Sequence, residues 1–121
     1  MLKIENTDFG EITVNGQTYD HDIVVFQNKI IERKKWITKE KHGTSHKFTR
    51  DEMEEYIKNE AAQKIDKVVV GTGQYEKLNL LPETKKYLEK KDIESELKKT
   101  SDLVGEQIGE ERAMLIIHVT C

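Results

Sequence analysis

The sequence has very few residues that crosslink a chain or interrupt its secondary structure. It contains one cysteine, Cys121, and one proline, Pro82. A single cysteine excludes an intrachain disulfide and a cysteine-based metal cluster, and it is typical of a reducing compartment. No Pro- or Ser-rich linker and no internal repeat divides the 121 residues. We therefore expect one domain, spanning residues 1–121.

The sequence also lacks an excess of charge of one sign and any long apolar run. Charged residues make up 36% of the chain, yet the formal net charge is only −3. Lysine and glutamate alternate on the same segments, which disfavours nucleic acid as a partner. No segment has the length of a membrane span or the pattern of a signal peptide, so we expect a cytoplasmic protein.

The first third of the chain has the alternating pattern of β-strands. Apolar and polar residues alternate over residues 9–26 on either side of Asn15-Gly16, a dipeptide typical of tight hairpin turns. A third apolar stretch runs from Ile30 to Ile37 and includes Trp36, which predicts a further strand with one wet face. Residues 41–47 are rich in Gly, Ser and Thr and predict a loop.

The first helix has the clearest local signal. Thr49 is suited to cap its N-terminus, and Glu52 stands three residues later, where it completes a capping box. One apolar face then recurs at helical spacing. Its residues are Met53, Tyr56, Ile57 and Ala61. This pattern predicts a helix that covers a sheet.

The second half alternates strands and helices. The β-branched run at Val68 to Val70 predicts an interior strand buried on both faces. Pro82 begins a helix to about Lys91, and a short strand follows at residues 93–97. A third helix is predicted from Thr100 or Ser101 through Ile108, and a last strand at residues 113–119. This order indicates an α/β fold with parallel neighbours joined by right-handed crossovers.

A glycine-containing segment follows the predicted interior strand and is a candidate ligand loop. It consists of Gly71, Thr72, Gly73, Gln74 and Tyr75. Ligands of open α/β sheets bind beyond the carboxyl ends of strands, where glycines let backbone N–H groups approach an anion. Neither a dinucleotide fingerprint nor a Walker pattern is present. A tight strand exit that needs positive φ explains the glycines equally well, and both interpretations stay open.

A second candidate segment carries histidines and hydroxyls within the predicted loop. Its candidate ligand residues are Thr44, Ser45 and His46. Adjacent residues such as Ser45 and His46 point apart in extended chain, so their adjacency makes no catalytic triad. Gly43 disfavours a helix that would bring His42 and His46 to one metal, and we expect no metal and no cofactor. His118 and Cys121 are interpreted as structural, and Trp36 as a possible anchor for a partner or a cover for the sheet.

Four motifs in this order resemble the Mth nine-three-eight domain family over nearly the whole chain. They are FGEITVNGQTYDHDIVV, KHGTSH, VVVGTGQY and IIHVTC. That family includes archaeal and bacterial proteins without an established reaction, an adipogenesis-associated protein and a mitochondrial assembly factor of respiratory complex I. The resemblance implies a three-layer fold with a mixed, mostly parallel central sheet flanked by helices and an N-terminal antiparallel β-hairpin layer. It also implies a shared pocket formed by Gly71 to Gly73 and Gly43 to His46.

Two hypotheses of function follow. The first is a small binding or assembly module whose polar pocket, at the Gly-Thr-Gly loop, takes a protein partner or a small anionic ligand. The second is an enzyme in which His46 acts as acid or base while the amides of Gly71 to Gly73 hold an anionic substrate. Glycines and hydroxyls at strand ends, without a complete catalytic set, favour the module.

Overall fold

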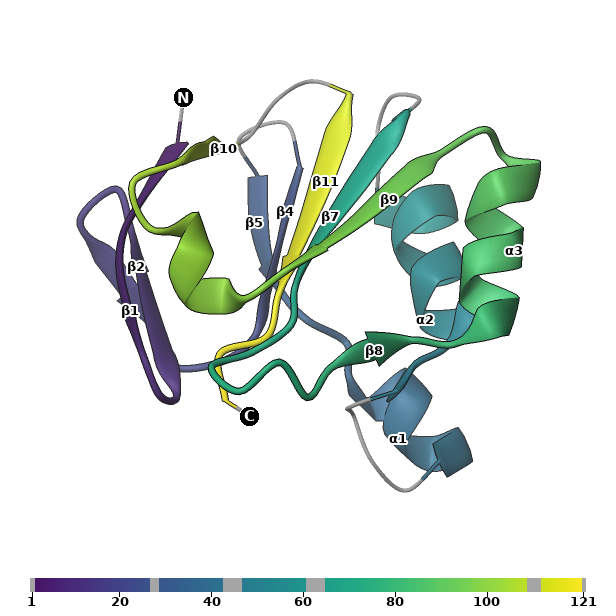
Figure 1. Ribbon diagram of the computed structural model, residues 1–121, viewed down its shortest axis with the longest axis horizontal. Helices are drawn as coiled ribbons and strands as arrows, with labels where there is room; N and C mark the ends of the chain where they lie inside the picture. The colour runs from purple at the N-terminus through teal and green to yellow at the C-terminus, as the bar shows by residue number, and fades with distance from the viewer. Residues whose placement is uncertain (1, 27–28, 43–46, 61–64, 109–111, 121) are drawn as a thin grey trace.

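The computed structural model describes residues 2–26, 29–42, 47–60, 65–108 and 112–120 (Figure 1). The strands are β1 (Leu2–Asp8), β2 (Glu11–Val14), β3 (Gln17–Tyr19), β4 (Ile23–Phe26), β5 (Lys29–Glu32), β6 (Lys47–Phe48), β7 (Lys67–Gly71), β8 (Asn79–Leu80), β9 (Glu94–Lys98), β10 (Gln107–Ile108) and β11 (Ala113–Ile117). The helices are α1 (Trp36–His42), α2 (Arg50–Glu55) with the π-helical turn η1 (Tyr56–Glu60), α3 (Pro82–Lys90) and the 3₁₀ turn η2 (Thr100–Leu103). Within these ranges, no helix is both long and apolar enough to cross a bilayer.

A mixed five-stranded sheet occupies the middle of the protein, with strand order β5-β4-β11-β7-β9. β7 pairs in parallel with both β11 and β9, while β4 is antiparallel to β11 and to β5. The valine run of β7 therefore lies in the interior of the sheet, as predicted. The predicted α/β class and the mixed sheet are confirmed.

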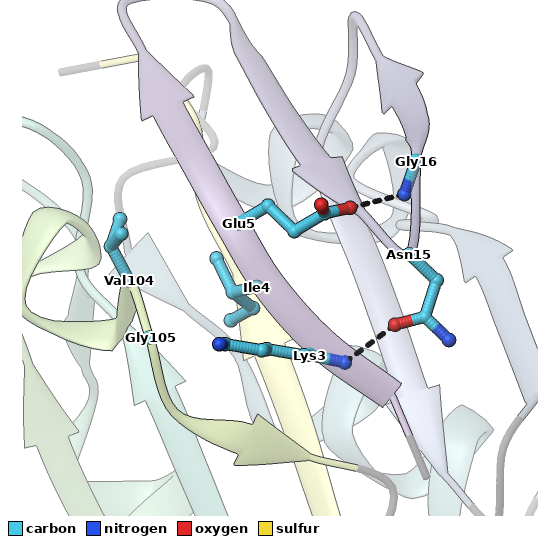
Figure 2. Close-up of a pocket in the computed structure, with 7 residues that line it drawn as sticks. All are labelled: Lys3, Ile4, Glu5, Asn15, Gly16, Val104 and Gly105. Carbon is cyan, nitrogen blue, oxygen red and sulfur yellow. Dashed lines mark hydrogen bonds between the residues drawn. The ribbon is translucent and has the colours of Figure 1, made fainter.

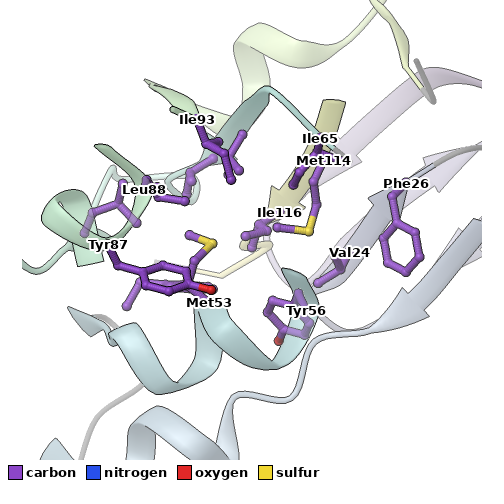
Figure 3. Packing of buried hydrophobic residues seen from close by; sticks show 14 of the residues in the cluster. Val24, Phe26, Met53, Tyr56, Ile65, Tyr87, Leu88, Ile93, Met114 and Ile116 are labelled. Atoms are coloured by element: carbon purple, nitrogen blue, oxygen red, sulfur yellow. The ribbon is translucent and has the colours of Figure 1, made fainter. Parts of the chain in front are cut away.

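Both faces of this sheet are covered, which produces three layers (Figure 1). Because side chains alternate along a strand, Met114 and Ile116 of β11 face the helices and Leu115 and Ile117 face the opposite way. The helical face packs against residues of α2, η1 and α3, including Met53, Tyr56, Tyr87 and Leu88 (Figure 3). The other face packs against the N-terminal sheet through Ile4, Ile12 and Val14.

The N-terminal layer is a four-stranded antiparallel sheet of order β10-β1-β2-β3. Asn15 and Gly16 both take positive φ, 49° and 81°, and connect β2 to β3 by a two-residue turn. These are the angles of the turn whose twist matches that of flanking strands. The predicted Asn-Gly hairpin and the N-terminal antiparallel layer are confirmed.

Two predicted elements are wrong. Trp36 and Ile37 belong to α1 and not to a strand, because β5 ends at Glu32 and pairs only as far as Ile23 of β4. The predicted helix from Thr100 to Ile108 is one 3₁₀ turn followed by β10. Gly105 has φ +88° and donates its N–H to Ile4 O at 2.7 Å, so pairing with β1 replaces the helix.

The close packing behind Gly71 generates a prediction. A Cβ at this position would lie 3.0 Å from Leu103 Cδ1 and 3.1 Å from Thr100 Oγ1. Gly71→Ala should therefore lower the free energy of unfolding by about 1 to 3 kcal/mol in urea denaturation. In a Leu103→Ala background the added cost of Gly71→Ala should be smaller, since the crowding methyl is gone. Equal costs in both backgrounds would contradict this packing.

Candidate functional site

The carboxyl ends of the three parallel strands meet at one edge of the central sheet. Gly71 of β7 is in register with Lys98 of β9 and with Ile117 of β11. Because β4 runs antiparallel, its first residue, Ile23, also pairs with Ile117. Residues that precede β4 and follow β5, β7, β9 and β11 are thereby gathered at the edge where α/β sheets bind ligands.

The Gly-Thr-Gly loop lies at this edge, but its backbone donors are used within the fold. Gly71, Thr72 and Gly73 are buried. The N–H of Thr72 donates to Lys98 O, that of Gly73 to Thr100 Oγ1 and that of Gln74 to Thr120 O, each at 2.8 Å. An anion would reach these amides only by displacing those acceptors. Ligand binding by Gly71 to Gly73 stays a prediction.

The other predicted site residues divide into two groups. Thr44, Ser45 and His46 lie outside the described residues, so their convergence with the Gly-Thr-Gly loop stays a prediction. Gln74 turns inward, and its side-chain amide donates to Thr7 Oγ1 and Asp8 O, both at 3.0 Å. Tyr75 turns outward and is 67% exposed.

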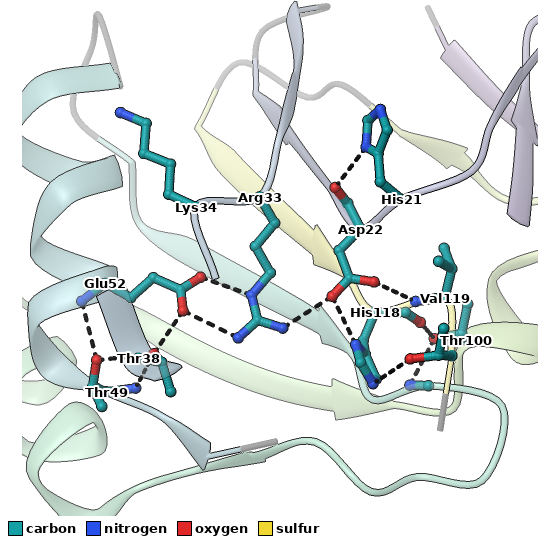
Figure 4. Close-up of polar contacts among 12 residues, drawn as sticks. His21, Asp22, Arg33, Lys34, Thr38, Thr49, Glu52, Thr100, His118 and Val119 are labelled. Atoms are coloured by element: carbon teal, nitrogen blue, oxygen red, sulfur yellow. Dashed lines mark hydrogen bonds and ion pairs between the residues drawn. The ribbon is translucent and has the colours of Figure 1, made fainter. Parts of the chain in front are cut away.

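A buried ion-pair network crosses the same end of the sheet (Figure 4). Arg33 follows β5 and donates to Glu52 of α2 through Nε (2.7 Å to Oε2) and Nη2 (3.1 Å to Oε1). Its Nη1 donates to Asp22 Oδ2 at 3.0 Å, just before β4. The side chains of Arg33 and Glu52 are 0% exposed and that of Asp22 is 3% exposed. A charge buried this deeply destabilises the folded state when it loses a partner.

Glu52 is the acceptor for one half of this network. Thr38 Oγ1 of α1 and Tyr56 OH each donate to its carboxylate at 2.7 Å. The predicted cap at Thr49 is present, since Thr49 Oγ1 accepts the N–H of Glu52 at 3.3 Å. The return bond of a capping box is not formed, because the Thr49 N–H donates to Thr38 Oγ1 instead. Burial and the charge of Glu52 both raise the pKa of Tyr56, which keeps its hydroxyl protonated as a donor.

Asp22 is the acceptor for the other half. Its Oδ1 accepts the Val119 N–H at 2.8 Å, and its Oδ2 lies 2.7 Å from His118 Nδ1. Burial alone would raise the pKa of Asp22. The hydrogen bond and charge of His118, the Val119 N–H and the charge of Arg33 outweigh burial and lower the pKa to about 2. Asp22 is therefore ionised at neutral pH.

His118 connects this carboxylate to a hydroxyl. It is 2% exposed, and its Nε2 lies 3.2 Å from Thr120 Oγ1. The order carboxylate, imidazole, hydroxyl is also that of hydrolytic triads. The neighbouring amides of Gly73 and Gln74 donate to Thr100 and Thr120, so they are not available to stabilise an oxyanion. Through His118 and the Val119 N–H, these contacts connect the chain after β11 to Asp22.

Two of the hollows on the described surface are lined by charged side chains. One, of about 380 Å³, lies over the Asp22–Arg33 pair; its lining residues are His21, Asp22, Glu32, Arg33, Lys35, Trp36 and Lys39. The other, of about 680 Å³, lies between β1, the β2–β3 turn and η2 (Figure 2). Its lining residues are Lys3, Ile4, Glu5, Asn15, Gly16, Val104 and Gly105. Among described residues, no cluster of His, Cys, Asp and Glu is suited to a metal ion.

The burial of Asp22, Arg33 and Glu52 was not predicted from the sequence. Arg33 stands in a basic run that is typical of a solvated surface, and Glu52 fits a cap. One signal for the burial of Arg33 was present in the sequence. Arg33 is the first residue after β5, which contains the apolar pair Ile30-Ile31. Only the tertiary structure shows which acidic residues it faces.

Loss of Arg33 generates the first prediction for this site. Arg33→Leu leaves Glu52 buried without a counter-charge and Asp22 with His118 as its remaining ion-pair partner, and it should lower the free energy of unfolding by about 3 to 5 kcal/mol. Arg112→Leu is the matched control, because Arg112 pairs with Asp66 on the exposed surface. Chemical denaturation measures both. Similar effects of the two changes would contradict the network's role.

The low pKa of Asp22 generates a second prediction. A folded pKa of about 2, below the ordinary 3.8, adds stability above pH 3.8 that is lost as the pH falls towards 2. We expect Asp22 to contribute about 2 kcal/mol to that loss. Asp22→Asn should be less stable at pH 7, and its stability should fall less between pH 5 and pH 2. Parallel pH profiles of the two proteins would refute the assignment.

Comparison with known proteins places this chain in a family. Residues 4–105 match the family described as "Protein of unknown function (DUF498/DUF598)". A conserved hypothetical protein, PH1505 from Pyrococcus horikoshii OT3, has a solved structure that is 44% identical, with a TM-score of 0.85 over 98% of this chain and 99% of that one.

A second solved structure, named MT938, is 26% identical, with a TM-score of 0.62 over the full length of both chains. Among curated proteins, none matches. The family match covers more than half of the chain, and the structural likenesses extend over nearly all of it. The chain therefore belongs to the DUF498/DUF598 family, the Mth nine-three-eight domain family that its four sequence motifs indicated.

Proposed function

We propose that the protein is a small binding module that docks a partner protein through Phe9 and Tyr75. The observation that carries this proposal is an exposed pair of aromatic rings whose centroids lie 6.0 Å apart. Phe9 is 55% exposed and Tyr75 is 67% exposed. Aromatic side chains bury a large area in protein interfaces, and tyrosine is one of the residue types that are enriched among those that dominate the binding energy.

The two segments that carry the rings are joined by hydrogen bonds. Phe9 lies in the turn between β1 and β2, and Tyr75 ends the Gly-Thr-Gly segment. Gln74 joins the two segments through its bonds to Thr7 and Asp8, and the Gly10 N–H donates to Val119 O at 2.8 Å. A surface that is already ordered loses less conformational entropy on binding, which supports a docking role.

The charges around the rings define the chemistry of the partner. Asp8, Glu11 and Glu76 are exposed on the two segments, against one exposed lysine, Lys77. This acidic rim favours a partner segment that carries basic residues beside an apolar or aromatic anchor. The buried glycines then act as the strand exit that presents Tyr75. The polar pocket that the sequence suggested at the loop stays a separate prediction.

The proposal includes a single domain over residues 1–121 and a cytoplasmic location. Its support is compositional: the one cysteine suits a reducing compartment, and no linker-like segment divides the chain. It includes no metal and no cofactor. The alternative function, an enzyme with His46 as acid or base, depends on a residue outside the described part of the chain.

The proposed docking surface predicts which peptides the protein selects. A phage-displayed library of random dodecapeptides should yield binders with a basic residue near an aromatic or leucine anchor. Phe9→Ala and Tyr75→Ala should each weaken the binding of a selected peptide by about tenfold or more, measured by calorimetry. Amide NMR signals of residues 7–10 and 74–77 should shift on titration.

Leu97→Ala is the matched control, because Leu97 is also an exposed apolar side chain (41%) and lies on β9. It should leave peptide affinity unchanged. Thermal unfolding of each variant separates a lost contact from a lost fold. Selection of no peptide, or of peptides whose affinity depends equally on Leu97, would contradict the proposal.

A further inference from the structure

Three neighbouring residues of the α1 segment form one face. Lys35 precedes the helix, Trp36 begins it and Lys39 follows one turn later. The Lys39 N–H donates to Lys35 O at 3.0 Å, which shows that the helical turn includes Lys35. Residues three and four apart are neighbours on a helix surface, so Lys35 and Trp36 both flank Lys39. Thr38 points the other way, is 0% exposed and bonds to Glu52.

This face forms one side of the 380 Å³ hollow. The volume falls in the lower part of the range of small-molecule sites. Asp22 and Arg33 line the hollow and are held by the buried network, while His21 and Glu32 complete the lining. His21 Nε2 lies 3.7 Å from Glu32 Oε1. One part of the lining is therefore fixed by buried ion pairs, and α1 is tied to the same network through Thr38.

The electrostatics of the hollow are uneven. Arg33 is neutralised by Asp22 and Glu52, and the neighbouring Lys34 pairs with Glu55 at 2.8 Å. In the described part of the chain, Lys35 and Lys39 have no ion-pair partner, and the indole of Trp36, 59% exposed, has no ring or cation contact. Two ammonium groups and an open aromatic face thus line one cavity.

We propose that this hollow binds a small planar anion, with its ring against the indole of Trp36 and its anionic group between Lys35 and Lys39. A hydroxyl or amino group at the opposite end of the ligand donates to Glu32, whose side chain is 70% exposed. An aromatic carboxylate and a nucleoside monophosphate share this chemistry. The site is separate from the Phe9 and Tyr75 surface, so it stands or falls independently of the proposed docking function.

The chain provides its own probe, because Trp36 is its only tryptophan. The single indole N–H signal in a proton–nitrogen NMR spectrum therefore reports on this hollow alone. We expect saturable shifts of that signal on titration with 4-hydroxybenzoate or with adenosine 5′-monophosphate. The neutral analogues 4-hydroxybenzamide and adenosine should bind about tenfold more weakly or not at all. Added salt should weaken the binding of both anions.

Paired variants isolate the role of the two lysines. Lys35→Gln/Lys39→Gln should weaken anion binding about tenfold, whereas Lys85→Gln/Lys86→Gln makes the same charge change at exposed positions on α3 and should have no effect. A response to the phosphate alone assigns the site to nucleotides, and a response to the carboxylate alone assigns it to aromatic acids. No saturable shift with either anion, or equal binding of the neutral analogues, would overturn the proposal.

Discussion

The structure depends on a guanidinium buried between two carboxylates. Arg33 leaves β5 and contacts Asp22, which precedes β4, and Glu52, which belongs to α2. Removing three charges from water is costly, and only a complete set of partners offsets the cost. Thr38, Tyr56, His118 and the Val119 N–H provide the remaining contacts. The network thus connects α1, α2, the ends of β4 and β5 and the chain after β11.

The backbone donors at this edge of the sheet have partners within the chain. Carboxyl ends of parallel strands are ordinarily where a ligand meets free backbone donors. Here Thr72, Gly73 and Gln74 donate to Lys98, Thr100 and Thr120, so the edge is closed by bonds within the chain. What the closed edge presents to solvent is a pair of aromatic rings on one side and, above the Arg33 network, a small basic hollow on the other. Hydrogen bonds of Gln74 lie beneath the first surface, and the ion pairs of Arg33 lie beneath the second.

Local chemistry made a large part of this fold predictable. The Asn15-Gly16 turn, the Thr49 cap and the helix that begins at Pro82 each depend on residues within a few positions, and all three are present. Predictions were wrong where a distant partner decided the outcome. The N–H of Gly105 donates to Ile4 O, about a hundred residues away, and a strand forms where a helix was expected. Trp36 begins a helix in which Thr38 donates a hydrogen bond to Glu52.

The sequence by itself determined the α/β class, the alternation that buries both faces of the central sheet and the family, because periodicity and turn chemistry are local properties of a chain. Only the tertiary structure decided the site. Arg33 lies 11 residues from Asp22 and 19 from Glu52, and His118 lies 96 residues from Asp22. The residues near each of them in sequence do not identify its partners, since the pairing of a buried charge depends on which opposite charges folding brings to it.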